Sequence, residues 1–367
     1  MINITPLNRK GLIKYLETDE YRNARFIPIT RHRALSHIHN PRAEDEDILM
    51  LLAHSSSELV GYLGVLADWI YESDGTRHKC GWLSCMWVDP NFRGQGISKR
   101  LVKTALEYWS QNILVTEFTA AAKGLYDKVG AFRDLQILEG IRLYRRLDLA
   151  KILPPKRAFF AKIKGVLTYI DYASNLVLDA RFLFDRPGNI KHMSYIDSLD
   201  AEVRNFIQSK STGHLFSRQS QEIDWILQYP WIIKAPSVDD FSARYHFSSV
   251  DSDFSFSAIK LKNERGAMTG FLLFAKRGKN LKLPYCFYDA EQLPKIICII
   301  KMHLKKWHIS TFTVFHKAIV EQLAKQYTFS FYKKKIKRHF IISKKLDHFI
   351  IGNVHLIQDG DADCAFT

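Results

Sequence analysis

A glycine-rich loop is the part of the sequence best suited to chemistry. It runs through Trp87-Val88-Asp89-Pro90-Asn91-Phe92-Arg93-Gly94-Gln95-Gly96-Ile97-Ser98, between an expected strand and an expected helix. Glycine has no Cβ, so a ligand can approach the backbone closely. The free N–H groups of a first helical turn attract phosphate, and Arg93 and Lys99 add positive charge beside them. The loop predicts a phosphate or pyrophosphate site over residues 93–98, with a plain glycine turn before a helix as the alternative.

The elements on both sides of this loop alternate between strand and helix. Residues 97–110 carry apolar side chains on one helical face and are expected as an amphipathic helix. The loop is not a P-loop, since no Gly-Lys-Ser/Thr follows, and Lys99 replaces the third glycine of a dinucleotide fingerprint. Strands are expected at 47–54, 59–71, 81–88, 113–118 and 141–147, and a short helix at 123–129. This order predicts a mixed α/β sheet with helices packed against it.

The same segment resembles the GNAT superfamily of acyl-CoA-dependent N-acetyltransferases. The family pattern, after a strand ending in Val-x-Pro, is Arg/Gln-x-x-Gly-x-Gly/Ala. Arg93, Gly96 and Ser98 occupy its positions, with Ser98 in place of glycine or alanine. A second family motif, a short helix with Leu-Tyr followed by Gly-Phe, matches Leu125-Tyr126-Asp127-Lys128-Val129-Gly130-Ala131-Phe132, although Thr119 stands where asparagine is common. The resemblance covers residues 1–150.

The resemblance implies that this segment binds acetyl-CoA as the acyl donor. The strand at 81–88 would separate from the strand at 113–118 and leave a cleft for the pantetheine arm. The pyrophosphate would bind the N–H groups of residues 93–98. The implied acyl-CoA site comprises Met86, Trp87, Val88, Arg93, Gly94, Gln95, Gly96, Ile97, Ser98 and Lys99.

Two proton transfers define the catalytic groups to look for. By the resemblance, Tyr126 would donate a proton to the leaving thiolate, and a core aromatic is the alternative. An amine must lose a proton before it attacks a thioester, so a carboxylate or histidine base is also needed. Glu117 and Asp68 are candidates by position, and each could instead be a solvated or salt-bridged carboxylate. Cys85 is expected to be a small buried hydrophobic side chain. His37 and His39 are expected to be surface histidines, because no metal-ligand spacing surrounds them.

The second half of the chain repeats this order of elements without a matching glycine loop. Strands are expected at 254–261, 268–276, 281–288, 311–315 and 329–343, with helices at 294–307 and 318–326. The turn before the 294–307 helix is Asp289-Ala290-Glu291-Gln292-Leu293-Pro294, which has two carboxylates and no glycine. Pyrophosphate would meet negative charge there. We therefore expect a degenerate, non-catalytic GNAT-like domain.

These patterns predict a tandem α/β protein of GNAT fold. The expected domains are a catalytic acyl-CoA-binding domain at 1–150, a helical connector at 151–194, the degenerate domain at 195–350 and a C-terminal tail at 351–367. Pro154-Pro155 marks the first boundary, and residues 157–184 have a helical, fairly apolar pattern.

Composition and charge limit the class of protein. Hydrophobic residues make up 47% of the 367 residues and charged residues 25%, which excludes a disordered or coiled-coil protein. Five cysteines without a Cys-x-x-Cys pair argue against a disulfide framework and fit a reducing cytosol. The N-terminus lacks a signal-peptide pattern, and charges interrupt the apolar stretch at 159–184. We expect a cytoplasmic protein without a transmembrane segment.

The net charge is +15, and the basic side chains of the second half could either face solvent or bind nucleic acid. The densest run, Lys333-Lys334-Lys335-Ile336-Lys337-Arg338, is interpreted as a solvated strand face, in preference to a nucleic-acid groove with interleaved aromatics. The sequence predicts an acetyl-CoA-dependent N-acetyltransferase that transfers acetyl directly to a small-molecule amine or other amino group, without a metal. The alternatives are a tRNA-dependent aminoacyl transferase of tandem-GNAT type and a non-catalytic acyl-CoA-binding or interaction module.

Overall fold

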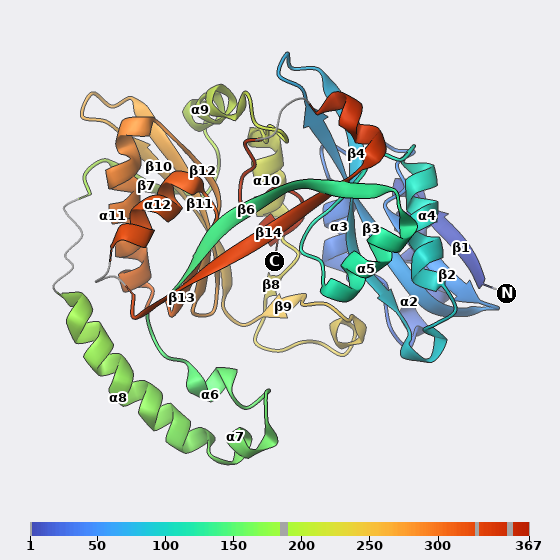
Figure 1. Cartoon of the computed structure of the whole chain (residues 1–367), viewed down its shortest axis with the longest axis horizontal. Helices are drawn as coiled ribbons and strands as arrows, with labels where there is room; N and C mark the ends of the chain where they lie inside the picture. Colours follow the sequence, from blue (N-terminus) through green and yellow to red (C-terminus); the bar gives the residue numbers. More distant parts are fainter. Residues whose placement is uncertain (1, 184–189, 327–329, 351–354, 367) are drawn as a thin grey trace. The chain divides into compact units, whose positions relative to one another are not determined.

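Two units of the fold are built from interleaved segments of the chain (Figure 1). The computed structural model describes residues 2–183, 190–326, 330–350 and 355–366. Unit 1 comprises residues 1–138, 198–254 and 338–367, and unit 2 comprises residues 139–197 and 255–337. The domain limits expected at residues 150, 194 and 350 stay a prediction, and the two units follow other limits.

Unit 1 contains a mixed sheet in the order β1-β2-β3-β4-β5-β14. The hairpins β1–β2, β2–β3 and β3–β4 are antiparallel, whereas β4 and β5 are parallel. Pro6 lies in the edge strand β1, where a missing N–H is tolerated. The first five strands are β1 (Ile2–Leu7), β2 (Met50–Ser55), β3 (Glu58–Tyr71), β4 (Arg77–Val88) and β5 (Ile113–Val115).

The helix that follows the glycine loop is fixed to this unit by its apolar face. In α4 (Ile97–Tyr108), Ile97, Leu101, Val102 and Ala105 are buried in the unit's core. Each fully buried aliphatic side chain contributes about 1.5–3 kcal/mol, so burial of this face holds the helix in place. The other helices of unit 1 are α1 (Arg9–Tyr15), α2 (Asp19–Asn23), α3 (Arg31–Ile38), α5 (Ala120–Val129), α9 (Ala201–Ser211) and α10 (Ser220–Gln228).

The strands of unit 2 pair in both antiparallel and parallel fashion. Antiparallel pairs join β10 to β7 and β11 to β12, whereas β12 and β13 are parallel. Its strands include β7 (Met193–Ile196), β10 (Phe254–Lys262), β11 (Met268–Arg277), β12 (Asn280–Tyr288) and β13 (Thr311–Val314). Its helices are α6 (Leu149–Ile152), α7 (Ala158–Lys162), α8 (Lys164–Leu183), α11 (Leu293–Lys306) and α12 (Lys317–Lys325).

Each unit receives a strand from the other half of the sequence. Strand β6 (Phe132–Tyr144) follows α5 in the chain, but its residues 141–144 pair with β13 in unit 2. Strand β14 (Tyr332–Ser343) follows α12, but Ile341 and Ile342 pair with Val115 and Leu114 of β5 in unit 1. The sequence does not reveal this exchange, because the residue patterns of β6 and β14 fit either sheet.

The expected order of elements is confirmed in both halves. Unit 1 begins the run β3-β4-α4-β5-α5-β6, and the second half repeats it as β11-β12-α11-β13-α12-β14. Helical structure over the expected connector is also confirmed by α7 and α8. Helix α3 escaped prediction because three of its five buried side chains are polar, namely Arg33, Ser36 and His37. The prediction of a mixed α/β fold is confirmed.

Candidate functional site

The glycine loop of unit 1 has a backbone that only glycine adopts easily. Gly94 and Gly96 have φ angles of +83° and +75°, in the left-handed region. A Cβ placed on either glycine would meet no atom within 4 Å, so the space above the loop is open. Before the loop, the buried Asp89 side chain accepts the Asn91 N–H at 2.9 Å and forms an ion pair with Arg25. The loop is therefore fixed at its start and open where a ligand would lie.

Helix α4 begins at this loop with its first N–H groups directed to the same region. Gly96 is its N-cap residue, and no side-chain hydrogen bond caps the helix. Arg93 and Lys99 are exposed, whereas Ile97 is buried and anchors the first turn. The helix dipole adds partial positive charge to these N–H groups. The arrangement suits a phosphate or pyrophosphate group.

Strand β4 leaves its neighbours at the point where it approaches the loop. The register with β3 passes from Gly64–Ser84 to Tyr62–Trp87, so β4 carries one extra residue, and Cys85 has a φ of +52°. On the other side, β4 pairs with β5 at Gly81 and Trp82, and within the described residues no pairing between them continues beyond Trp82. Residues 83–88 of β4, which include the predicted contacts Met86, Trp87 and Val88, therefore have an edge free of β5.

Tyr126 lies in α5, which carries the second sequence motif. Thr119 caps this helix by accepting the Ala122 N–H at 3.2 Å, as the more common asparagine would. The Tyr126 ring is 4% exposed and packs edge-on against Phe118 and Phe132, with centroids 6.0 and 5.4 Å away. Burial, followed by the charge of Asp363, raises the pKa of Tyr126 to about 12. The phenol is thus protonated at neutral pH and can act as a proton donor.

The C-terminal segment 355–366 lies against β4 and supplies a carboxylate that the sequence did not reveal. Ser84 Oγ donates a hydrogen bond of 2.6 Å to Asp363 Oδ2, and Asp363 itself is half-buried. Phe366 fixes the segment by stacking on Trp231, with centroids 4.5 Å apart, and by an edge-on contact with Trp225. The expected C-terminal tail is structured over these residues, and its other positions, 351–354 and 367, lie outside the described residues.

The surroundings of Asp363 have opposing effects on its pKa. Burial raises the pKa of Asp363 above the usual carboxyl value, against the lowering effects of the Ser84 hydrogen bond and the positive charge of Arg33. Arg33 donates a hydrogen bond of 2.9 Å to Ser84 Oγ, and its guanidinium lies 3.5 Å from the centroid of the Trp231 ring. Arg33, Ser84 and Asp363 thus form one hydrogen-bonded chain beside the bulge of β4.

The predicted base Asp68 is occupied by other contacts. Its Oδ1 accepts a 2.7 Å bond from Arg42, and its Oδ2 accepts 2.7 Å bonds from Arg218 and the Trp82 indole. The side chain is fully buried. Arg42 also pairs with Glu222 at 2.7 Å. Asp68 is therefore the centre of a buried ion network, which favours a structural role.

The other predicted residues make different contacts. Glu117 has a 48% exposed side chain and accepts a 2.6 Å bond from Arg338. The expectation of a surface position is wrong for His37, which is buried and stacks on Trp231. Burial, with the charge of Arg33, lowers the pKa of His37 to about 3. His39 stacks on Tyr229 at 4.7 Å and lines a surface cavity of about 340 Å³. Within the described chain, no group of three or more His, Cys, Asp or Glu side chains is arranged to hold a metal ion.

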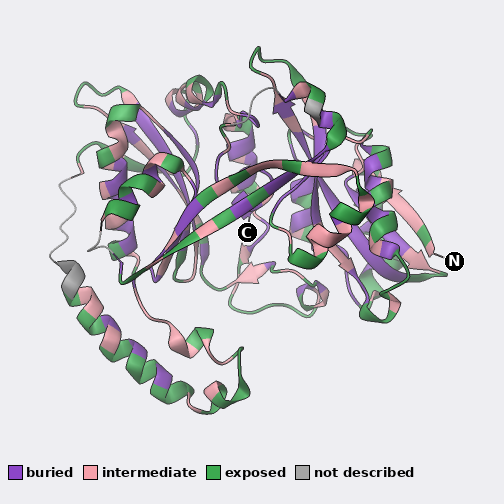
Figure 2. Ribbon diagram, viewed as in Figure 1, coloured by how far each residue is buried: buried purple, intermediate pink, exposed green. Residues whose placement is uncertain are grey.

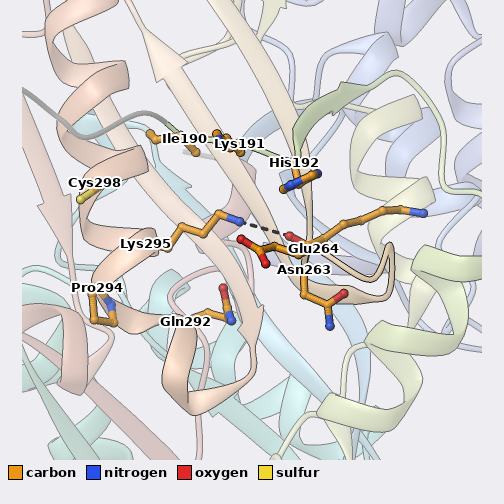
Figure 3. A pocket seen from close by; sticks show the side chains of 10 residues that line it. Ile190, Lys191, His192, Asn263, Glu264, Gln292, Pro294, Lys295 and Cys298 are labelled. Carbon is orange, nitrogen blue, oxygen red and sulfur yellow. Dashed lines mark hydrogen bonds between the residues drawn. The ribbon is translucent and has the colours of Figure 1, made fainter.

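In unit 2, the position equivalent to the glycine loop has a different construction (Figure 3). The turn before α11 has no glycine, as the sequence shows. A cavity of about 470 Å³ lies at this end of the helix, with Lys191 and Glu264 among its lining residues. Lys295 Nζ donates to the Lys262 carbonyl at 3.1 Å in its wall. Three lysines, Lys191, Lys262 and Lys295, line this cavity. The acidic turn, by contrast, predicts negative charge there.

About a third of the chain matches a known family. Residues 13–131 match the family model described as the acetyltransferase (GNAT) family. This match agrees with the glycine loop and the α5 motif, so residues 13–131 are a GNAT acetyltransferase domain. The prediction of a GNAT-type enzyme is thereby confirmed at the level of the family. No curated protein shows significant sequence similarity to the chain.

Solved structures extend the likeness to most of the chain. A protein of Enterococcus faecalis V583, described as a "probable N-acyltransferase", is similar over 93% of this chain and 72% of its own, with a TM-score of 0.52 and 8% identity. Saccharomyces cerevisiae N-myristoyltransferase, solved with myristoyl-CoA, is similar over 93% and 82%, with a TM-score of 0.50 and 10% identity. A tandem GNAT protein from the clavulanic acid biosynthesis pathway is similar over 93% and 98%, with a TM-score of 0.50 and 11% identity. At these identities the likeness shows the fold, and it confirms the predicted tandem GNAT architecture.

Proposed function

We propose that the protein is an acetyl-CoA-dependent N-acetyltransferase that transfers acetyl directly to an amine in a ternary complex. The open glycine loop at the start of α4 carries this proposal. The family match supports acetyl as the acyl group, and the yeast structure with myristoyl-CoA supports an acyl-CoA donor. The acceptor class is a small molecule or another group with a free amine.

The chain offers a binding surface for each part of the donor. The N–H groups of residues 93–98 would hold the pyrophosphate, with Arg93 and Lys99 as counter-charges. The free edge of β4 at Met86 and Val88 would hydrogen-bond the pantetheine arm. Acetyl-CoA supplies an acyl group activated as a thioester. The protein binds and orients it.

The proton transfers are assigned to Tyr126 and Asp363. Tyr126 keeps its proton at neutral pH and would pass it to the departing thiolate sulfur. Asp363 would accept a proton from the ammonium group of the acceptor, directly or through Ser84, and the free amine would then attack the thioester. A half-buried carboxylate with a raised pKa suits this role better than Asp68, whose two oxygens already accept four hydrogen bonds between them. Asp68 and Glu117 stay predictions for the base.

Gly96→Glu is expected to weaken acetyl-CoA binding by about 100-fold or more. The new carboxylate would enter the open space above the loop and repel a phosphate. Loss of two hydrogen bonds to a charged group costs about 1.5–3 kcal/mol each. Isothermal titration calorimetry of acetyl-CoA measures the change.

Gly75→Glu is the matched control for this variant. Gly75 is also left-handed, at φ +91°, with no atom within 4 Å of an added Cβ, and it lies in the turn between β3 and β4. The control separates backbone strain from loss of the site. Equal acetyl-CoA affinity in wild type and Gly96→Glu would remove the pyrophosphate assignment.

Tyr126→Phe is expected to lower kcat by about 10- to 100-fold and to leave acetyl-CoA affinity unchanged. This decrease in kcat is at or below the lower end of the range for loss of a general acid, because the thiolate of a thiol with a pKa near 8.5 already leaves readily. Stopped assays of thiol release with a panel of amines give kcat, and calorimetry gives the affinity. A large loss of affinity with unchanged kcat would assign Tyr126 to binding instead of proton donation.

The amine panel also tests the alternative of a non-catalytic acyl-CoA-binding module. Thiol release that depends on both acetyl-CoA and an amine supports the enzyme. Acetyl-CoA binding without thiol release for any amine supports the module. Co-purifying RNA, seen as a high ratio of absorbance at 260 nm to that at 280 nm, would favour the tRNA-dependent alternative.

A further inference from the structure

Helix α8 of unit 2 is exposed along much of its length (Figure 2), and most of its apolar residues are among the exposed ones. Tyr169 and Val177 are each 71% exposed, and Leu176 is 63% exposed. With Val166, Ile170 and Ala173 they recur at intervals of three and four residues, so they form one stripe along the helix. Single exposed apolar residues are ordinary, but a continuous stripe of this kind marks an interaction surface.

The opposite face of α8 is attached to its unit through polar side chains. Asp171 accepts hydrogen bonds of 2.8 and 2.9 Å from the N–H groups of Leu149 and Ala150, and thereby caps α6. Asn175 exchanges two hydrogen bonds with the backbone of Leu147, at 2.8 and 2.9 Å. Asp179 pairs with Arg146 at 2.7 Å. The helix is therefore held in place by polar contacts. An ordinary surface helix turns its apolar face to the protein, whereas α8 turns polar side chains to it and apolar side chains to solvent.

The segment that leads into α8 carries charge of a single sign. Residues 149–170 contain no acidic residue. Their basic side chains are all exposed, and within the described residues none of them forms a salt bridge: Lys151, Lys156, Arg157, Lys162 and Lys164. Phe159, which is 62% exposed, lies among them. Basic and aromatic side chains next to an apolar helical stripe are typical of segments that bind at a lipid headgroup boundary.

We propose that residues 156–180, the α7–α8 segment, dock on the surface of an anionic phospholipid bilayer. The helix would lie in the plane of the interface, with its apolar stripe in the acyl boundary and the basic side chains on the headgroups. Within the described residues, no helix is both long and apolar enough to cross a bilayer, so the segment would rest on the surface. A second copy is disfavoured as the occupant, because two copies would bring their unpaired basic side chains together. The proposal is independent of the acetyltransferase activity.

Co-sedimentation of the full chain with vesicles tests the proposal. The vesicles are phosphatidylcholine alone and phosphatidylcholine mixed with phosphatidylglycerol. The basic variant is Lys156→Glu/Arg157→Glu/Lys162→Glu, and its control reverses three exposed lysines elsewhere in unit 2, Lys317→Glu/Lys334→Glu/Lys335→Glu. The apolar variant is Tyr169→Ser/Leu176→Ser/Val177→Ser, and its control changes three exposed apolar residues of unit 1, Ile13→Ser/Tyr108→Ser/Val238→Ser. The lysine control changes the net charge by the same amount as the basic variant. The apolar control replaces the same number of exposed apolar side chains by serine as the apolar variant.

The wild-type protein is expected to bind the phosphatidylglycerol vesicles and to bind phosphatidylcholine vesicles much more weakly. Each cation near an anionic surface contributes about fivefold, so loss of three cations alone should lower the partition coefficient of the basic variant by about 100-fold. The three new carboxylates should lower it further, whereas the control lysine variant should be far less affected. The apolar variant should lose binding to the same vesicles while its control retains it.

Three results would overturn the proposal. The first is a wild-type protein that does not sediment with phosphatidylglycerol vesicles. The second is an equal loss in each variant and its control, which would reduce the effect to net charge or general surface polarity. The third is a wild-type dimer in light scattering that the apolar variant converts to a monomer, which would assign the stripe to a second copy.

Discussion

Replacing Asp363 with Asn is expected to lower kcat by about 10²- to 10⁴-fold and to leave acetyl-CoA affinity unchanged. The amide keeps the shape of the side chain and its contact with Ser84 Oγ, which now lies 2.6 Å from Asp363 Oδ2. It cannot accept a proton from an ammonium group. Thiol release at saturating amine gives kcat, and Asp134→Asn, a change at an exposed carboxylate of β6, is the control.

The pH dependence gives this prediction a second readout. The base must be deprotonated, so kcat/KM of the wild type should fall as the pH drops through the pKa of Asp363. Burial raises the pKa of Asp363, so the fall should occur above the usual carboxyl range. Asp363→Asn should lack this acid limb. An unchanged kcat, or an unchanged acid limb, would return the role of base to Glu117, Asp68 or another group.

Replacing Asp68 with Ala is expected to lower the free energy of unfolding by about 3–5 kcal/mol. The change would leave Arg42 and Arg218 buried, each without the carboxylate that it now contacts at 2.7 Å. Urea denaturation measures the loss as a lower midpoint. Asp45→Ala, which breaks the more exposed pair of Arg9 and Asp45, is the control and should cost about 1 kcal/mol or less.

The same position also separates a structural from a catalytic carboxylate. Asp68→Asn keeps the shape of the side chain but removes its charge from the buried network. We expect it to lose stability in the same direction as Asp68→Ala. A folded Asp68→Asn protein with wild-type stability and strongly reduced kcat would contradict the structural role and support Asp68 as the base.

The sequence predicted those parts of the candidate site that consist of residues close together in the chain. The glycine loop, the amphipathic helix from Ile97 and the α5 motif around Tyr126 each depend on residues within one or two turns of each other. The left-handed φ of Gly96 and the cap of α5 by Thr119 are local consequences of those residues. Local physics was therefore sufficient to predict the glycine loop and the two helices that follow it in the chain.

The parts that the sequence did not predict depend on contacts between distant segments. Ser84 and Asp363 are 279 positions apart, and no periodicity or spacing links them. By sequence, Asp68 could be a base or a solvated or salt-bridged surface carboxylate, and only the tertiary structure shows that it is buried beside Arg218. Arg33 lies on a helix whose buried face is largely polar, so hydrophobic periodicity could not identify it. Only tertiary structure assembles these groups.

The exchange of β6 and β14 has a consequence for the order in which the protein is made. Strand β5 pairs with β14 through Val115 and Ile341, so this edge of β5 has no partner until the ribosome has also synthesised β14. At roughly 5–20 residues per second, that interval is about 10–45 s. An open strand edge is a template for pairing with other chains. The nascent protein therefore passes through a period in which the half that carries the glycine loop is exposed to aggregation, and the synthesis of β14 ends this period.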